Sequence, residues 1–266
     1  MKFISFSSGS SGNCYFIFTE HDGLMIDAGV GVRQLKKDFV NYGLSMSSIK
    51  NILLTHDHAD HVKSVGSLCH DLMVPVYSTK KVHRGVEGNY CVRRKIELGL
   101  ARFLEKNVTV DIGDFKVTPF DVPHDSQDNV GYLIQHGDTK FCMVTDVGCV
   151  TEEIGGFISS ADYLVLEANH DIEMLRSGTY PYILKQRIAS ERGHLSNHDC
   201  GKALVRYATE RLKHVWLCHL SNENNHPELA RKTVEYLLQS HGITPGKDFI
   251  LDVLNRTRPT GIFSLE

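Results

Sequence analysis

The feature that most constrains this chain is a dense cluster of ionisable side chains directly after an apolar β-type run at residues 49–55. The cluster places four possible metal ligands within six residues, and it reads His56-Asp57-His58-Ala59-Asp60-His61. In an extended segment His56 and His58 point to the same side, and the next two ligands, at the start of an expected helix, can turn toward a second ion. The pattern therefore predicts two adjacent metal ions at the carboxyl end of a strand. An exposed polar turn is the alternative, but the motif is much more specific than a lone histidine.

Length and charge limit the kinds of partner. The chain has 266 residues, of which 41% are apolar and 23% charged, as in a folded globular protein. Its 29 Lys and Arg against 32 Asp and Glu give a net charge of -3, which excludes a protein that coats nucleic acid through a global positive charge. Positive charge for a nucleic-acid strand could come from one of two local groups of basic residues. Each group taken alone is more typical of a solvated helix face. The groups are Arg84, Arg93, Arg94, Lys95, Arg102 and Lys106, or Arg33, Lys36 and Lys37.

The sequence gives no sign of a membrane segment or of a disulfide framework. No apolar run approaches the roughly 18 to 20 residues that span a bilayer, and the opening apolar stretch is shorter than that of a signal peptide. The seven cysteines are an odd number without a C-x-x-C pair, which predicts mostly buried free thiols. We therefore expect a cytoplasmic protein without a membrane partner, and the sequence indicates no obligate protein partner.

Short strands and helices alternate along the whole chain. An opening antiparallel meander is expected from strands at 2–6, 14–19 and 24–27, with a Ser/Gly loop between the first two. Further strands are expected at 49–55, 74–78, 108–112, 115–120, 130–135, 140–145, 163–167, 214–219 and 249–253, and helices at 32–41, 151–160, 199–212 and 227–241. Residues 80–106 are expected to be largely helical. No linker or repeat divides the chain, which favours a single domain over residues 1–266, with sheets inside and helices outside.

The cluster at residues 56–61 resembles the His-x-His-x-Asp-His signature of the metallo-β-lactamase fold superfamily. Three later residues, each after an apolar β-type run, resemble the remaining ligands of that family and arrive in its order: His124, Asp146 and His219. Taken singly, each is more typical of a hydrogen-bonded turn. The resemblance covers nearly the whole chain and implies an α/β (α+β) protein with a four-layer αββα sandwich, the metallo-β-lactamase fold.

The resemblance also implies how two divalent ions are held. One ion would be held by three imidazoles, those of His56, His58 and His124. The other would be held by the imidazoles of His61 and His219 and the carboxylate of Asp60. The carboxylate of Asp146 would bridge the two ions. Imidazole with carboxylate suits zinc or manganese. Two ions about 3.5 to 4 Å apart can share a hydroxide, because they lower the pKa of water toward about 7.

Asp27, in Met25-Ile26-Asp27-Ala28-Gly29, resembles the family's early Asp at a strand end. The resemblance implies that it accepts the second ring N–H of a ligand histidine and so fixes its tautomer. A helix-capping role near Gly29 is the alternative.

Two further residues favour phosphodiester substrates. Glu167 ends an apolar run and His194 lies in Gly193-His194-Leu195-Ser196-Asn197, and the pair resembles the Glu and His dyad of the RNase Z and RNase J branches. A neighbouring carboxylate raises the pKa of an imidazole, which would keep His194 protonated as a general acid. The alternative is that both residues only cap a helix and a turn.

The stretch at residues 169–197, with the Ser/Gly loop at 8–13, closely resembles the YycJ/WalJ subgroup. The resemblance to that subgroup implies 5′-to-3′ exonuclease action on DNA and a link to bacterial cell-wall signalling. Two loops offer backbone N–H groups and polar side chains that could contact the substrate. The first loop contains Ser10, Ser11 and Asn13, and the alternative is that it is only a turn between two strands. The second contains Ser221, Asn222, Asn224 and Asn225, and the alternative is that it only caps the following helix. The 73 residues from Asp146 to His219 leave no room for a large cap domain, so a lid would come only from 80–106.

We therefore predict a metal-dependent phosphodiesterase that acts on nucleic acid, most readily a 5′-to-3′ DNA exonuclease. The hydroxide held by the ions attacks phosphorus, Asp60 and Asp146 orient ions and nucleophile, and His194 backed by Glu167 protonates the leaving oxygen. The alternative is a small-molecule hydrolase of the same fold, acting on a thioester, a lactam or a cyclic phosphodiester. A non-enzymatic regulator would be expected to have lost ligands, and a diiron oxygen reductase would carry Glu at position 58.

Overall fold

The computed structural model describes residues 1–266, whose contacts divide into two compact units. The first unit contains Met1–Pro119, Ser126–Val130 and Asn255–Glu266, and the second contains Phe120–Asp125 and Gly131–Leu254. No helix combines the length and the apolar character that crossing a membrane requires. A single domain over the whole chain stays a prediction.

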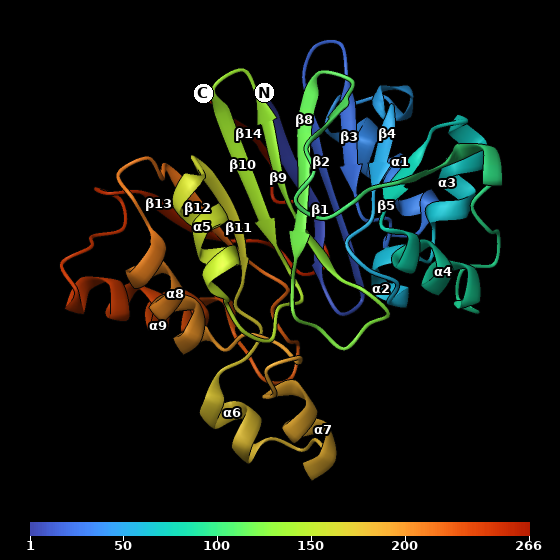
Figure 1. The fold of residues 1–266 in the computed structure, drawn as a ribbon. Coiled ribbons are helices and arrows are strands. Elements are labelled where there is room, and N and C mark those ends of the chain that lie inside the picture. The colour runs from blue at the N-terminus through green and yellow to red at the C-terminus, as the bar shows by residue number, and fades with distance from the viewer. The chain divides into compact units, whose positions relative to one another are not determined.

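The first unit is built on a mixed sheet with the strand order β14-β1-β2-β3-β4-β5-β6 (Figure 1). Its strands are β1 (Lys2–Gly9), β2 (Gly12–Phe18), β3 (Gly23–Ile26), β4 (Asn51–Leu53), β5 (Val76–Ser78), β6 (Ala101–Phe103) and β14 (Ile262–Ser264). Pairing is antiparallel from β14 to β3 and parallel from β3 to β6. The remaining elements are α1 (Val32–Asn41), η1 (Met46–Ser48), α2 (Ala59–Val62), α3 (Val65–Leu72), α4 (Lys80–Gly88), η2 (Leu98–Leu100) and the hairpin of β7 (Val110–Ile112) with β8 (Phe115–Asp121, whose last two residues are counted with the second unit).

Helices cover one face of this sheet because their apolar stripes pack on it. The ring of Phe39 from α1 lies 4.7 Å from that of Phe6 and 5.3 Å from that of Phe16, between ring centroids. Buried residues of α3 and α4 join the same core cluster. The packing holds the parallel strands β3 and β4 in register, so that the residues following them lie at one edge of the sheet.

Two expectations for this unit need correction. The Ser/Gly segment is not a loop: β1 runs to Gly9 and β2 starts at Gly12, so that only Ser10 and Ser11 form the turn. Residues 80–106 are not largely helical, because after α4 the chain forms a short 3-10 turn and then β6, which pairs with β5. The segment therefore ends as part of the sheet and not as a lid.

The second unit contains five strands of the other sheet in the order β13-β12-β11-β10-β9. They are β9 (Val130–His136, whose first residue is counted with the first unit), β10 (Thr139–Val144), β11 (Tyr163–Glu167), β12 (His214–Cys218) and β13 (Ile250–Val253). Its helices are α5 (Glu152–Ser160), α6 (Ile172–Ser177), α7 (Tyr182–Ile188), α8 (Asn197–Tyr207) and α9 (Pro227–Ser240). The pairs from β10 to β13 are parallel.

The helices of the second unit fall into two sets. Buried residues of α5, α8 and α9 form one core cluster with β10, β11 and β12. The helices α6 and α7 lie away from those three, past the ends of the strands (Figure 1). Because consecutive parallel strands end at the same edge of a sheet, the residues that follow β10, β11 and β12 gather there, on the side where α6 begins.

Candidate active site

The histidine cluster of the first unit lies between β4 and α2. His58 is the N-cap of α2, and the ring of His56 lies 4.6 Å from that of His58 and 4.1 Å from that of His61, between centroids. His56 and His61 are fully buried, whereas the side chain of Asp60 is 25% exposed. The structure therefore brings together the four residues that the sequence pattern singled out in this segment.

Asp27 lies at the end of β3, fully buried and with a positive φ of 59°. Its Oδ1 accepts the backbone N–H of Thr55 at 2.8 Å, and its Oδ2 accepts Nδ1–H of His61 at 2.7 Å. The contact with a histidine ring that the resemblance implied is therefore present, while the N-cap of α1 is Gly31, without a side-chain bond. Because Nδ1 of His61 is the donor, its Nε2 carries the lone pair, which is the form a metal ligand needs.

Asn13 is buried against this cluster and does not lie in an exposed loop. Its Nδ2 lies 2.8 Å from Nε2 of His61 and 3.2 Å from Oδ2 of Asp60. Ser10 and Ser11, by contrast, are exposed in the turn, where the carbonyl of Ser11 accepts a bond from Lys63 Nζ at 2.7 Å. Of the three loop residues expected to contact substrate, Asn13 thus lies at the ligand atoms of two predicted metal ligands.

The loop after β3 is fastened to α2 through its backbone. The N–H of Ala28 donates to the carbonyl of His61 at 2.6 Å, and the N–H of Gly29 donates to the carbonyl of Asn13 at 2.8 Å. A Cβ on Gly29 would lie 1.6 Å from the carbonyl oxygen of Asp60. Only a glycine therefore allows the two segments to approach this closely.

We predict that Gly29→Ala lowers the free energy of unfolding by about 1 to 3 kcal/mol, because the added methyl group must displace the backbone at Asp60. Urea unfolding, followed by the fluorescence of the single, buried Trp216, measures the change. Gly31→Ala is the matched control, since nothing lies within 4 Å of a Cβ there. Equal destabilisation by both variants would contradict the prediction.

In the second unit, three candidate residues follow three neighbouring parallel strands. Asp146, Glu167 and His219 come at the ends of β10, β11 and β12, where Val144 pairs with Leu166 and Glu167 with Cys218. Asp146 and His219 have positive φ values of 51° and 52°. Such backbone costs roughly 1 to 3 kcal/mol per residue and collects at functional sites.

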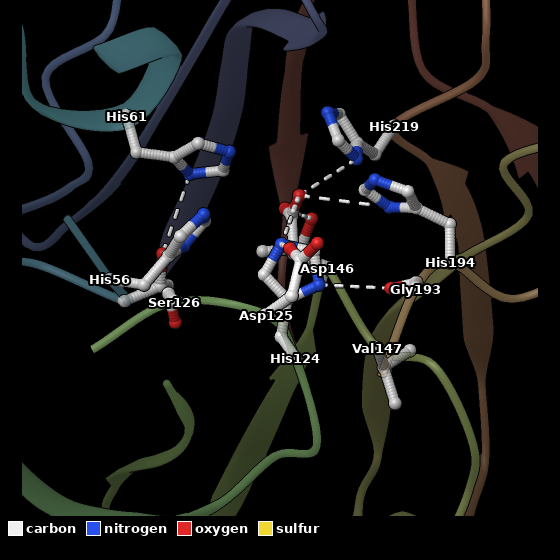
Figure 2. Close-up of polar contacts among 12 residues, drawn as sticks. His56, His61, His124, Asp125, Ser126, Asp146, Val147, Gly193, His194 and His219 are labelled. Atoms are coloured by element: carbon white, nitrogen blue, oxygen red, sulfur yellow. Dashed lines mark hydrogen bonds and ion pairs between the residues drawn. The ribbon is translucent and has the colours of Figure 1, made fainter. Parts of the chain in front are cut away.

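Glu167 is fully buried, and its carboxylate accepts four hydrogen bonds. Its Oε1 accepts Nδ1–H of both His194 and His219, each at 2.8 Å, and its Oε2 accepts the backbone N–H groups of Val147 at 2.8 Å and Leu195 at 3.2 Å. Figure 2 shows His194 and His219 joined by dashed lines to one shared oxygen. Burial alone would raise the pKa of Glu167, but His194 and His219 lower it to about 2. The residue is therefore a buried carboxylate anion.

His194 is the more accessible of the two rings, with 20% of its side chain exposed. Burial lowers its pKa, but Glu167 and Asp146 outweigh that effect, so that the pKa of His194 is raised above its ordinary value. Because Nδ1 faces Glu167, the proton that the ring can deliver elsewhere is on Nε2. This is the arrangement of a general acid.

His124 is tied to the same loop. Its Nδ1 donates to the carbonyl of Gly193 at 2.9 Å, as Figure 2 shows, and its own carbonyl accepts a bond from Arg192 at 2.8 Å. Burial lowers the pKa of His124. The ring is therefore neutral with its lone pair on Nε2, 3.8 Å from Oδ1 of Asp146. As with His61 and His219, the protein fixes the tautomer that binds metal.

The donors of the second unit suit a divalent ion. Oδ1 of Asp146 lies 3.8 Å from Nε2 of His124, and the Nδ1 bonds of His124 and His219 make Nε2 of each ring the ligand atom. Imidazole nitrogens with carboxylate oxygens are the set that zinc and manganese accept. The residues present therefore fit the cations that the sequence pattern predicted.

Comparisons with known proteins decide the family. The beta-lactamase superfamily domain matches residues 23–219. The chain is also 34% identical, over 98% of each chain, to exodeoxyribonuclease YycJ of Bacillus anthracis. It is 35% identical to exodeoxyribonuclease WalJ of Streptococcus pneumoniae, over 93% of this chain and 92% of that one.

This chain belongs to the beta-lactamase superfamily, in its YycJ/WalJ group. The zinc-bound PqqB of Methylobacterium extorquens aligns over 100% of both chains with a TM-score of 0.72 at 17% identity, which shows a common fold. The predicted metallo-β-lactamase fold class, two mixed sheets flanked by helices, is thus confirmed. The protein is a hydrolase of this fold, and the fold implies divalent metal ions.

Some polar residues of the loop after His219 form hydrogen bonds within the protein. Ser221 Oγ accepts the backbone N–H of Asn224 at 3.1 Å, as a turn residue does. Asn225 Nδ2 donates to the carbonyls of Ala168 and Asn169, at 2.9 and 3.0 Å. Asn222 is exposed and lies 3.3 Å from Glu223 Oε1. Of the four candidate substrate contacts in this loop, only Asn222 is exposed.

Sequence reasoning missed the residues that hold the site in place. Asn169 Nδ2 donates to the carbonyl of His219 at 2.8 Å, and Arg192 and Gly193 hold His124 from 68 and 69 residues away. Their only signal was membership of the stretch at 169–197 that resembles the YycJ/WalJ subgroup. No local pattern marks a backbone carbonyl as a histidine partner.

We predict that Glu167→Ala lowers the free energy of unfolding by about 3 kcal/mol or more, because it leaves two buried N–H groups and two rings without their acceptor. Glu167→Gln, which keeps Oε1 as an acceptor, should cost less. Urea unfolding of chelator-treated protein, followed by Trp216 fluorescence, measures both. An alanine variant as stable as the wild type would refute the structural role.

Proposed function

We propose that this protein is a metal-dependent exonuclease that removes nucleotides from the 5′ end of DNA. The observation that carries the proposal is the sharing of Oε1 of Glu167 by Nδ1 of His194 and of His219, since it supplies one ring for a cation and one for a proton. The names of the YycJ and WalJ relatives, both exodeoxyribonucleases, support DNA as the substrate. The 5′-to-3′ direction follows the subgroup resemblance.

The proposal includes two divalent ions, zinc or manganese, which seven residues would hold. These are His56, His58 and His124 for one ion, Asp60, His61 and His219 for the other, and Asp146 as the shared ligand. When bound, such ions lower the pKa of water and neutralise charge on phosphate. Asp27 and Glu167 then act as the carboxylates that orient His61 and His219.

The protein's own contribution to bond cleavage is proton transfer and orientation. Oxygen from water forms the new bond to phosphorus, and the bond from phosphorus to O3′ of the terminal nucleotide breaks. His194 donates its Nε2 proton to that leaving O3′, and Glu167 stabilises the imidazolium before transfer. Asp60 and Asp146 would hold the ions and, with them, orient the attacking oxygen.

Substrate contacts in the proposal come from exposed polar and cationic groups. Ser10, Ser11 and Asn222 are exposed, whereas Asn13 and Ser221 would have to give up present hydrogen bonds. Of the basic residues, Lys106 pairs with Asp128 at 2.6 Å and Arg94 with Asp71 at 3.3 Å. We propose that Arg84 and Arg93, which are exposed, bind phosphates of the DNA backbone. All seven cysteines are free, which supports the proposed cytoplasmic location.

We predict that the purified protein binds about two equivalents of zinc or manganese per chain, as two ligand sets require. His56→Ala and His219→Ala, which each remove one imidazole ligand, should each lower the bound metal. Elemental analysis after dialysis measures the ratio, with His241→Ala, at an exposed position, as the control. Unchanged metal in both ligand variants would refute the assigned sites.

We predict that the protein with manganese or zinc releases mononucleotides from 5′-labelled DNA, and that His194→Ala slows this by about 100-fold or more with bound metal unchanged, as removal of a general acid does. Rates on 5′- and 3′-labelled strands give the direction, and elemental analysis gives the metal content. His198→Ala, at a partly exposed ring on α8, is the control.

A model phosphodiester and a thioester are assayed in parallel. Thioester hydrolysis without DNA cleavage would favour the small-molecule hydrolase. Loss of metal together with activity in His194→Ala would show that His194 is a ligand.

A further inference from the structure

A cavity of about 530 Å³ lies in the second unit beside His194. Its walls come largely from α6, α7 and the loop before α8, and the lining includes His170, Leu175, Arg176, Tyr182, Lys185 and His194. The volume is within the range of small-molecule sites. The cavity thus opens next to the ring that the proposed function uses as a proton donor.

The two helices that wall the cavity are fastened to each other. Lys185 Nζ, from α7, donates to the carbonyls of Arg176 at 2.9 Å and Gly178 at 2.6 Å, at the end of α6. Asp171 caps the start of α6 through the N–H of Met174. The cavity is therefore formed by a braced helix pair before any ligand arrives.

These helices expose apolar and aromatic surface that the core does not use. Tyr182 is 72% exposed, Ile183 80% and Ile172 46%. In contrast, α5, α8 and α9 each bury an apolar stripe in the core. Exposed aromatic surface beside a cavity is typical of a binding site.

The inside of the cavity is neutral at its base and mainly cationic at its rim. His170 is 2% exposed and burial lowers its pKa to about 4, so that its ring is an uncharged wall beside Leu175. Arg176 and Lys185 bring two positive charges. The one carboxylate in the lining, Asp199, already accepts the hydroxyl of Ser196 at 2.7 Å.

We propose that this cavity binds the sugar and base of the terminal nucleotide of the DNA strand, with the base stacked on Tyr182. The inference deepens the proposed function and rests on it. In the proposed function the nucleoside that carries the leaving O3′ lies against His194, and this cavity opens beside the same ring. Arg176 faces the phosphate of that nucleotide, and Lys185, whose Nζ stays bonded to the carbonyls of Arg176 and Gly178, adds positive charge to the same wall. A cavity of this size admits one nucleotide.

The test compares a DNA strand whose 5′-terminal nucleotide lacks its base with the intact strand. For the wild type, kcat/KM of the first cleavage should fall by about 5- to 100-fold without the base, the range expected for loss of one base–aromatic stack. Tyr182→Ala should lower kcat/KM on intact DNA by a similar factor and on the abasic strand hardly at all. Tyr182→Phe keeps the ring and should retain the base dependence.

Tyr236→Ala is the matched control, because Tyr236 lies on α9 and is 73% exposed. A second readout uses no catalysis: binding of dAMP to chelator-treated protein, by calorimetry, should weaken in Tyr182→Ala and not in Tyr236→Ala. Equal cleavage of intact and abasic ends, or equal loss in both alanine variants, would overturn the inference.

Failure of the proposed function would look different. In that case the wild type cleaves neither strand, yet hydrolyses a model phosphodiester or a thioester. If DNA is cleaved without any dependence on the terminal base, the exonuclease stands and the cavity assignment falls.

Discussion

The site of the second unit depends on one buried negative charge. Removing a carboxylate from water is costly unless hydrogen bonds replace the lost hydration. Glu167 receives four of them, from two backbone N–H groups and two imidazoles. These donors come from the loop after β10, the loop before α8 and the end of β12. One anion therefore holds three chain segments and two histidine tautomers at once.

Strained backbone accompanies this arrangement in both units. Asp27, Asp146 and His219 each follow a strand with φ between 51° and 59°. The left-handed turn is unfavourable for a non-glycine residue, so specific bonds must offset it. Thr55 supplies them to Asp27, Thr145 Oγ1 donates to Asp146 Oδ2 at 2.9 Å, and Asn169 donates to the carbonyl of His219. Each strand end is fixed by a neighbour rather than by its own propensity.

This explains which parts the sequence could predict. Local apolar patterns predict the strand before His56 and the strand that ends at Glu167, and both are confirmed. The helix expected to start around Asp60 and His61 is present as α2, from Ala59. The part of β1 at Ser7–Gly9 could not be predicted, because serine and glycine favour turns and only contacts with distant residues reverse that preference. The Oγ of Ser7 donates to the carbonyl of Arg256, 249 residues away. In the same way β6 exists because β5 offers it a parallel partner.

The short helices α6 and α7 escaped prediction because six and seven residues give too few turns for an apolar period. Function in a shared fold resides in loops placed on a rigid scaffold. Here a single loop serves two purposes: Gly193 orients His124, and His194 joins the buried carboxylate to the cavity of α6 and α7. A displacement of residues 193–194 would therefore disturb His124 and Glu167 together, whereas a substitution on the exposed faces of α6 and α7 alters only the cavity walls.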